Sequence, residues 1–192
     1  MAKKESSFIN MVITLFVITA VASLALGGVY NITKEPIRLA QIAKAEKAIK
    51  EVIPAFDTLM KFKVMPENGK DSLTFNQGLK DGNLVGVAVE SYSNEGYSPT
   101  QIKIMVGFLP DGKINNTAVV QQKETPGLGT KMTSEKFKAQ FRDKDPKQYT
   151  LKVVKDGGDV DAITAATISS RAFCDAVQRA YTTFEKTEGG NK

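Results

Sequence analysis

Four hydroxyl side chains fall within residues 161–170, Asp-Ala-Ile-Thr-Ala-Ala-Thr-Ile-Ser-Ser, where the chain enters an apolar helical pattern. The small residues between them let a bulky group approach the backbone. The unpaired N–H groups at the positive end of a helix favour a phosphate, and Arg171 could add a charge-assisted hydrogen bond to it. The alternative is a plain helix cap, because Ser and Thr are preferred there, and the residues alone favour the cap.

A second segment, Glu124-Thr125-Pro126-Gly127-Leu128-Gly129, directly follows a predicted strand. Its Pro-Gly pair favours a tight turn, and the second glycine permits an unusual backbone angle or the close approach of a ligand. Upstream, the turn at 94–97 carries Tyr97, whose ring could stack on a planar ligand. Considered singly, each segment also fits an ordinary turn with simple packing.

The composition excludes several kinds of site. The chain has no histidine and one cysteine, so zinc sites with His or paired Cys ligands, iron–sulfur clusters, His-ligated haem and a Ser-His-Asp triad lack their residues. The net charge of +5 comes from lysines scattered among acidic residues, which is typical of a solvated surface and predicts no nucleic-acid binding. Cys174 is predicted to be a packing residue of the last helix.

The N-terminal part of the chain predicts a membrane span. Residues 11–30 carry no charge and, with Phe8 and Ile9, are long enough to cross a hydrocarbon core of about 30 Å. A cleaved signal peptide is the alternative, because residues 20–22 read Ala-Val-Ala, but the apolar run continues well past that site and favours retention. The positive charges on either side give only weak support for a cytoplasmic N-terminus. They are Lys3, Lys4, Lys34 and Arg38.

The remaining periodicities predict an α+β domain, an antiparallel sheet with flanking helices, behind one transmembrane helix. We expect residues 1–33 to form a cytoplasmic tip and the anchor, 34–186 the folded domain, and 187–192 a flexible tail. The expected helices are an amphipathic helix from Pro36 to Pro54, a short helix capped by Thr133-Ser134 that carries Phe137 and Phe141, and a last helix over 169–185. The expected strands are 84–92, 101–108, 113–120 and 149–154, with turns at Asp81-Gly82-Asn83 and Pro110-Asp111-Gly112.

Three landmarks together resemble the FMN-binding subunits of the Rnf and Na⁺-translocating NADH:quinone oxidoreductase complexes, most closely the G subunit of Rnf. They are the single N-terminal span, the turn at 124–129 and the Asp-x-x-Thr-x-Ala-Thr-x-Ser pattern at 161–169, in the family order. The resemblance covers nearly the whole chain. It implies that 34–186 is an FMN-binding domain and that a flavin transferase joins the phosphate of FMN to Thr167.

The resemblance also implies the residues around the cofactor. The family usually has glycine at the position of Ala165, and if that position needs a positive φ, alanine carries strain there. The turn at 124–129 is expected to line the flavin pocket, with Lys131 near the isoalloxazine ring. The full expected set is Asp161, Thr164, Ala165, Ala166, Thr167, Ser169, Ser170, Glu124, Thr125, Pro126, Gly127, Leu128, Gly129, Lys131 and Tyr97.

The implied role is one electron-transfer step between ferredoxin and NAD⁺, coupled by membrane subunits to Na⁺ or H⁺ movement. The chain would then be a single-pass component of a bacterial inner-membrane complex, with other Rnf subunits as partners, its domain on the periplasmic side and no catalytic acid or base of its own. Two alternatives stay open. One is the C subunit of the NADH:quinone oxidoreductase, and the other is a flavin-free tethered scaffold.

Overall fold

A computed structural model describes residues 7–67 and 69–188 of the 192-residue chain. The chain divides into two units, Met1–Ala43 and Lys44–Lys192. Residues 1–6 of the predicted cytoplasmic tip and residues 189–192 of the predicted tail lie outside the described part.

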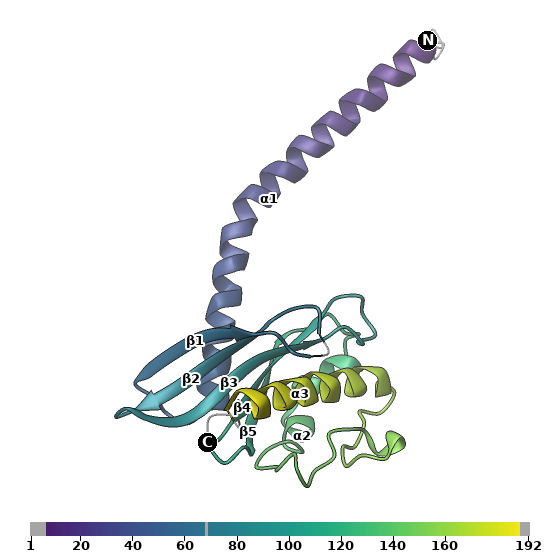
Figure 1. Cartoon of the computed structure of the whole chain (residues 1–192). Helices are drawn as coiled ribbons and strands as arrows, with labels where there is room; N and C mark the ends of the chain where they lie inside the picture. The colour runs from purple at the N-terminus through teal and green to yellow at the C-terminus, as the bar shows by residue number, and fades with distance from the viewer. Residues whose placement is uncertain (1–6, 68, 189–192) are drawn as a thin grey trace. The chain divides into compact units, whose positions relative to one another are not determined.

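The first element is one long helix, α1 (Phe8–Val52) (Figure 1). Among the described residues, α1 is the one helix that is long and apolar enough to cross a membrane. Its apolar stretch lies near the N-terminus and is not buried against protein. The prediction that a new helix begins at Pro36 is wrong, because Pro36 lies inside α1. Proline removes one hydrogen bond from a helix, and the helix continues where the turns on both sides remain bonded.

Five antiparallel strands form a meander in the order β1-β2-β3-β4-β5 (Figure 1). The structure confirms the three strands predicted over 84–92, 101–108 and 113–120, and it adds two that the sequence pattern did not predict. Asp81 and Gly82 have φ values of 50° and 79° and form the tight turn between β2 and β3, as a two-residue hairpin requires. The strands are β1 (Thr58–Val64), β2 (Leu73–Lys80), β3 (Asn83–Ser93), β4 (Ile102–Phe108) and β5 (Ile114–Gln121).

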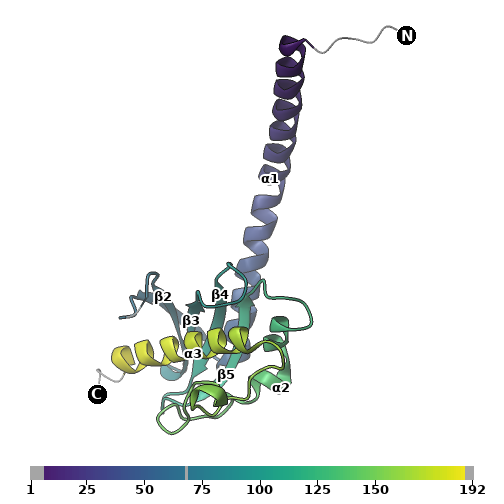
Figure 2. The ribbon, with the colours of Figure 1, turned by 90° about the vertical axis from the view of Figure 1, so that its right-hand side faces the viewer.

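The C-terminal helix α3 (Thr167–Glu188) lies across one face of the sheet (Figure 2). It confirms the helix predicted over 169–185, with Phe173, Val177, Ala180 and Phe184 all buried. Alternate residues of the central strands serve the two faces of the sheet. Phe75, Val89 and Val106 belong to the core beneath α3, whereas Ala88, Met105 and Ala118 pack against the last turns of α1.

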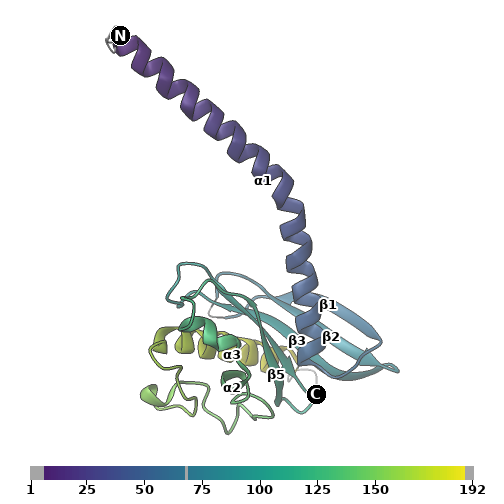
Figure 3. The same ribbon diagram turned by 180° about the vertical axis from the view of Figure 1, so that it is seen from behind.

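The last turns of α1 are part of the folded domain, on the sheet face opposite α3 (Figure 3). Side chains at the start of β5 satisfy the last helical carbonyl groups, which have no partner within the helix. Asn115 donates from Nδ2 to the Val52 carbonyl at 2.8 Å, and Asn116 donates to the Glu51 carbonyl at 3.1 Å. A Cβ at Gly107 would overlap the Val52 carbonyl, so glycine is required where the helix meets β4.

A buried lysine also ties α1 to the following short helix, α2 (Glu135–Lys138). The Lys138 side chain is 8% exposed, and its ammonium lies 2.9 Å from Glu51 and 2.7 Å from Glu135. Burial alone would lower the pKa of Lys138, but hydrogen bonds with Glu135 and Glu51 outweigh burial and raise it. The end of α1 is therefore held by two amides and one charged network.

We expect Asn115→Ala to lower the free energy of unfolding by about 1–2 kcal/mol, because the Val52 carbonyl loses its donor in a partly buried place. Asn83→Ala is the matched control, since Asn83 is exposed and its own hydrogen bond is long at 3.4 Å. That control should change stability by less than about 0.5 kcal/mol. Urea unfolding of the detergent-solubilised full chain measures both values. Equal losses in the two variants would contradict a capping role for Asn115.

Two short 3₁₀ helices, η1 (Gly129–Thr133) and η2 (Val154–Asp156), complete the domain. The short helix predicted after Thr133-Ser134 is confirmed in part as α2, which carries Phe137 but ends at Lys138, before Phe141. Ser134 makes no side-chain capping hydrogen bond. The strand predicted over 149–154 is wrong, because this region is a loop with one isolated bridge between Val153 and Val160. A side chain in place of a neighbouring strand bonds the backbone at the start of this loop, since Asp159 Oδ2 accepts a hydrogen bond from the Thr150 N–H at 2.7 Å.

Candidate functional site

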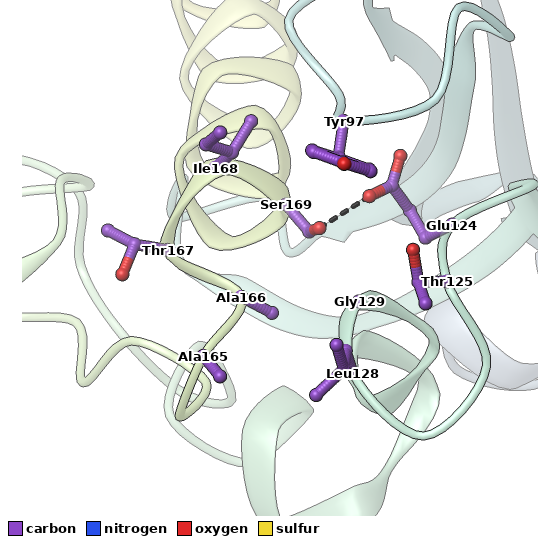
Figure 4. Close-up of a pocket in the computed structure, with 10 residues that line it drawn as sticks. All are labelled: Tyr97, Glu124, Thr125, Leu128, Gly129, Ala165, Ala166, Thr167, Ile168 and Ser169. Atoms are coloured by element: carbon purple, nitrogen blue, oxygen red, sulfur yellow. Dashed lines mark hydrogen bonds between the residues drawn. The ribbon is translucent and has the colours of Figure 1, made fainter.

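The segment after β5 and the start of α3 meet at a pocket of about 520 Å³ (Figure 4). This volume falls within the usual range of small-molecule sites, about 300–1,000 Å³. Nine of the fifteen predicted site residues line the pocket, although they come from three separate segments of the sequence. The ten lining residues are Tyr97, Glu124, Thr125, Leu128, Gly129, Ala165, Ala166, Thr167, Ile168 and Ser169.

A tight turn over 163–166 leads into α3. The Ala166 N–H donates to the Ile163 carbonyl at 2.9 Å, and Ala165, the third residue of the turn, has φ 60°. A turn with positive φ at that position alone is type II, which favours glycine. Buried Ser170 holds the turn closed, because its hydroxyl accepts from the Ile163 N–H at 2.9 Å and donates to the Ala166 carbonyl at 3.0 Å.

We expect Ala165→Gly to raise the free energy of unfolding by about 0.5–1 kcal/mol, because it relieves the left-handed backbone but adds freedom to the unfolded chain. Ala166→Gly is the matched control, since Ala166 is buried and has no positive φ. The control should be destabilised by about 1 kcal/mol. Urea unfolding of the full chain in detergent measures both changes. A loss of stability in Ala165→Gly would contradict backbone strain at this position.

Thr167 is the first residue of α3 and stands at the edge of the pocket. Its hydroxyl makes no hydrogen bond to another described residue, and its side chain points away from Glu124 (Figure 4). The N–H groups of Thr167, Ile168 and Ser169 likewise have no hydrogen-bond acceptor among the described residues. A free hydroxyl thus lies beside unpaired N–H groups at the positive end of a 22-residue helix, an arrangement that favours a bound phosphate.

The opposite wall of the pocket carries a buried carboxylate, Glu124, which is 4% exposed. Its Oε1 accepts a hydrogen bond from the Ser98 N–H at 3.0 Å, and its Oε2 accepts one from the Ser169 hydroxyl at 2.5 Å (Figure 4). Two glycines leave room for it, because a Cβ at Gly96 would lie 2.8 Å from Oε1 and a Cβ at Gly129 would lie 2.8 Å from Oε2. The Glu124–Ser169 hydrogen bond joins the two predicted motifs.

The turn at 124–129 has the conformation that its Pro-Gly pair predicts. Gly127 has φ 75°, and its N–H donates to the Thr130 hydroxyl at 3.0 Å. Pro126 and Gly127 shape this turn without lining the pocket, whereas Leu128 reaches the pocket and is 38% exposed. Lys131 is exposed on η1 and is not a lining residue.

Other predicted contacts lie outside the pocket. Asp161 is exposed and is held by Gln140, whose side-chain oxygen accepts from the Asp161 N–H at 2.8 Å. Thr164 is an exposed residue of the type II turn. The structure gives no support to the predicted contact between Arg171 and a phosphate at this pocket, because Nε and Nη2 of Arg171 each donate to an oxygen of Asp156 at 2.7 Å. Arg171 lines a separate cavity.

Cys174 also lies away from this pocket, and its predicted packing role is confirmed. The side chain is buried in the core beneath α3. Burial raises the pKa of the Cys174 thiol to about 12, so the group stays protonated and unreactive at neutral pH.

Ile168 is a lining residue that the sequence pattern did not predict. It is 47% exposed in the first turn of α3, and Tyr97 on the other side of the pocket is 70% exposed. An apolar side chain on the outward face of an amphipathic helix was the available signal, because that face is otherwise polar. Tyr97, Leu128 and Ile168 give the pocket an apolar rim that suits a flat aromatic ring.

Residues 96–182 match the family model of the FMN-binding domain. This interval contains all ten lining residues of the pocket. The chain is 33% identical over 185 residues to the G subunit of the ion-translocating oxidoreductase complex of Methanosarcina acetivorans, covering 94% of this chain and 96% of the relative. It therefore belongs to the family of G subunits of ion-translocating oxidoreductase complexes.

The chain is also similar to a second G subunit and to a solved structure. The chain is 30% identical over 184 residues to the G subunit of the proton-translocating ferredoxin:NAD(+) oxidoreductase complex of Clostridium ljungdahlii, covering 94% of this chain and 91% of the relative. The crystal structure of Shewanella oneidensis NqrC aligns with 74% of this chain and 72% of its own chain, at 24% identity and a TM-score of 0.48.

Proposed function

We propose that the chain is a membrane-anchored electron carrier of an ion-translocating oxidoreductase and that it holds FMN in the pocket, joined through its phosphate to the Thr167 hydroxyl. The observation that carries this proposal is the Thr167 hydroxyl itself, which has no hydrogen bond to a described residue and stands at the positive end of α3 on the edge of the pocket. Bound FMN would supply the redox chemistry, and the chain supplies position and electrostatics.

The other hydroxyls of the motif are less suited to attachment. Ser169 donates its hydrogen to Glu124, and Ser170 is buried within the turn that precedes α3. Thr164 is exposed but does not line the pocket. Among the four, Thr167 alone combines a position on the pocket with a hydroxyl that is free of hydrogen bonds to the described residues.

The remaining residues of the pocket have distinct tasks in this proposal. The first N–H groups of α3 would bind phosphate oxygens, since they lack acceptors among the described residues. The apolar rim of Tyr97, Leu128 and Ile168 would cover the ring on part of its surface and leave it open to partner proteins. A covalent phosphate link would prevent loss of FMN from so open a pocket.

A denaturing gel tests the proposal. After expression beside a flavin transferase, the denatured full chain should fluoresce under ultraviolet light, because a phosphoester survives unfolding of the pocket. Native protein that is yellow but loses its colour on denaturation would contradict covalent attachment. Protein that is colourless before denaturation would contradict FMN binding altogether and favour a flavin-free scaffold.

We further propose that partners are the other subunits of the complex, with electrons passing between ferredoxin and NAD⁺. The relative from Clostridium ljungdahlii, a subunit of a ferredoxin:NAD(+) oxidoreductase, supports this choice. In this arrangement α1 remains uncleaved in the cytoplasmic membrane, and the FMN-binding domain of 34–186 lies on its outer side. The flanking charges give that orientation weak support.

Thiol labelling of intact cells is expected to establish this orientation. Lys113→Cys lies on the exposed turn between β4 and β5 and should react with a membrane-impermeant reagent from outside, whereas Lys4→Cys should react only after lysis. Native Cys174 is buried and gives little background. The reverse pattern would contradict the orientation, and a mature N-terminus just after Ala22 would show that the apolar segment is a cleaved signal peptide.

A further inference from the structure

Glu124 is a buried acidic residue without a cationic partner among the described residues. The residue is 4% exposed, yet it forms no ion pair with a described residue. Its two oxygens accept hydrogen bonds from neutral donors, the Ser98 N–H and the Ser169 hydroxyl. Burial of a carboxylate without a cation is costly, and charged residues are almost never buried unless they are paired.

The position of this carboxylate is closely fixed. Gly96 lies against Oε1 and Gly129 lies against Oε2, and neither position has room for a Cβ without displacing the carboxylate. The hydrogen bond from Ser98 fixes Oε1 against the loop between β3 and β4, and the hydrogen bond from Ser169 fixes Oε2 against α3. The negative charge of Glu124 is therefore held at one place on the pocket wall, and it is the one charged side chain among the residues that line the pocket.

We propose that Glu124 lowers the midpoint reduction potential of the bound flavin by placing an uncompensated negative charge on the pocket wall. This inference rests on the proposed function, because it requires FMN in the pocket. Reduction of the neutral oxidised ring by two electrons and one proton leaves one negative charge on the ring. The charge of Glu124 repels it and so favours the oxidised form, and charge near a flavin ring is one way in which a protein tunes its electronics.

The pocket is small enough for the charge to matter. If a pocket of about 520 Å³ were a sphere it would be roughly 10 Å across. Two unit charges roughly 10 Å apart, at an effective dielectric constant of about 20, interact strongly enough to change an equilibrium by about tenfold or more, when that equilibrium creates one of the two charges. Salt screens such a pair less than it screens exposed charges, because the carboxylate is buried. We therefore expect removal of the charge to change the ratio of oxidised to reduced flavin at a fixed potential by at least about tenfold, or about 30 mV for a two-electron couple.

A purely structural role for Glu124 makes a different prediction. If Glu124 only joins the turn at 124–129 to α3, the hydrogen bonds matter and the charge does not. Glu124→Gln separates the two roles, because its amide oxygen can accept from the Ser98 N–H while its NH₂ donates to the Ser169 hydroxyl. Ser169→Ala is the complementary control, since it removes one hydrogen bond and keeps the charge.

A second pair of variants leaves Glu124 and its hydrogen bonds in place. Thr125 is the exposed neighbour of Glu124 and lines the same pocket. Thr125→Lys places a positive charge there and should raise the potential in the same direction as Glu124→Gln. Thr125→Gln adds an uncharged side chain at the same place, so the difference between the potentials of Thr125→Lys and Thr125→Gln isolates the effect of the charge. If Glu124→Gln holds no flavin, this pair keeps the inference open to contradiction, because equal potentials in Thr125→Lys and Thr125→Gln would show that the flavin does not respond to charge at this wall.

The experiment is a spectroelectrochemical titration of the FMN-loaded full chain, with a chemical reductant as the electron source. Glu124→Gln is expected to raise the midpoint potential with at least about a tenfold shift of the equilibrium, while Ser169→Ala shifts it less than about threefold. The equilibrium of Thr125→Lys should differ from that of Thr125→Gln by at least about tenfold, with the higher potential in Thr125→Lys. Unchanged potentials in Glu124→Gln and Thr125→Lys would overturn the inference, as would an equal rise in Ser169→Ala. Wild-type protein that holds no FMN at all would instead overturn the proposed function, and the inference with it.

Discussion

Thr167→Val is expected to abolish covalent flavin while leaving the fold intact. The methyl group of valine replaces a hydroxyl that makes no hydrogen bond to a described residue, so little packing or bonding changes at the start of α3. The denatured variant should show no flavin fluorescence on a gel, whereas the wild type fluoresces. Native Thr167→Val can still carry some dissociable FMN, because the pocket wall is unchanged.

Thr164→Val is the matched control for this result. Thr164 lies three residues earlier in the same motif, is exposed and does not line the pocket. Its valine variant should retain covalent flavin, although recognition by the transferase can reduce the yield. A fluorescent Thr167→Val band beside a dark Thr164→Val band would show that Thr164, and not Thr167, is the attachment point.

Gly129→Ala is expected to have the second large effect, a loss of flavin binding on the order of tenfold or more. The new Cβ would overlap the Ser169 hydroxyl and would lie 2.7 Å from the Glu124 Cβ, so the wall of the pocket has to move. Overpacking of this kind costs about 1–3 kcal/mol, which corresponds to about one tenfold step or more in binding. Titration of free FMN into Thr167→Val protein with and without Gly129→Ala measures the effect, because this background has no covalent link and reports the affinity of the pocket itself.

Two further variants test the cause of that loss. In the same Thr167→Val background, adding Ser169→Ala to Gly129→Ala removes the overlapping hydroxyl and should recover part of the affinity for FMN. Gly28→Ala adds the same methyl group where no heavy atom lies within 4 Å and should change nothing. Equal affinities for FMN with and without Gly129→Ala would mean that the pocket tolerates the overlap and that its shape is not set by this contact.

Local sequence patterns were sufficient for the strongly periodic elements of the fold. The buried runs of β3 and β4 and the apolar face of α3 have few polar interruptions, so their periods are clear. The missed strands β1 and β2 have weaker patterns, because β1 is an exposed edge strand and β2 contains a buried asparagine and Gly78. Gly78 is needed for packing, since a Cβ there would lie 2.8 Å from the Ile53 side chain, a contact between distant segments.

The same distinction applies to the candidate site. Turn chemistry at 124–129 and hydroxyl clustering at 161–170 identified the two segments, and the positive φ of Ala165 agrees with the strain expected where the family usually has glycine. The sequence pattern did not reveal how the segments are joined. The Glu124–Ser169 hydrogen bond and the pairing of Arg171 with Asp156 depend on tertiary positions that local spacing does not encode. The sequence alone therefore left Arg171 available to a phosphate, although in the fold it is already paired.

Peptide mass spectrometry of the wild-type chain can locate the flavin on a single residue. Trypsin should release residues 156–171 as one peptide, because Lys155 precedes it and Arg171 ends it, and this peptide contains all four candidate hydroxyls. We expect an added mass of FMN less one water, with fragment ions that place it on Thr167. An unmodified peptide from flavin-transferase-treated protein, or the added mass on Thr164, Ser169 or Ser170, would contradict it.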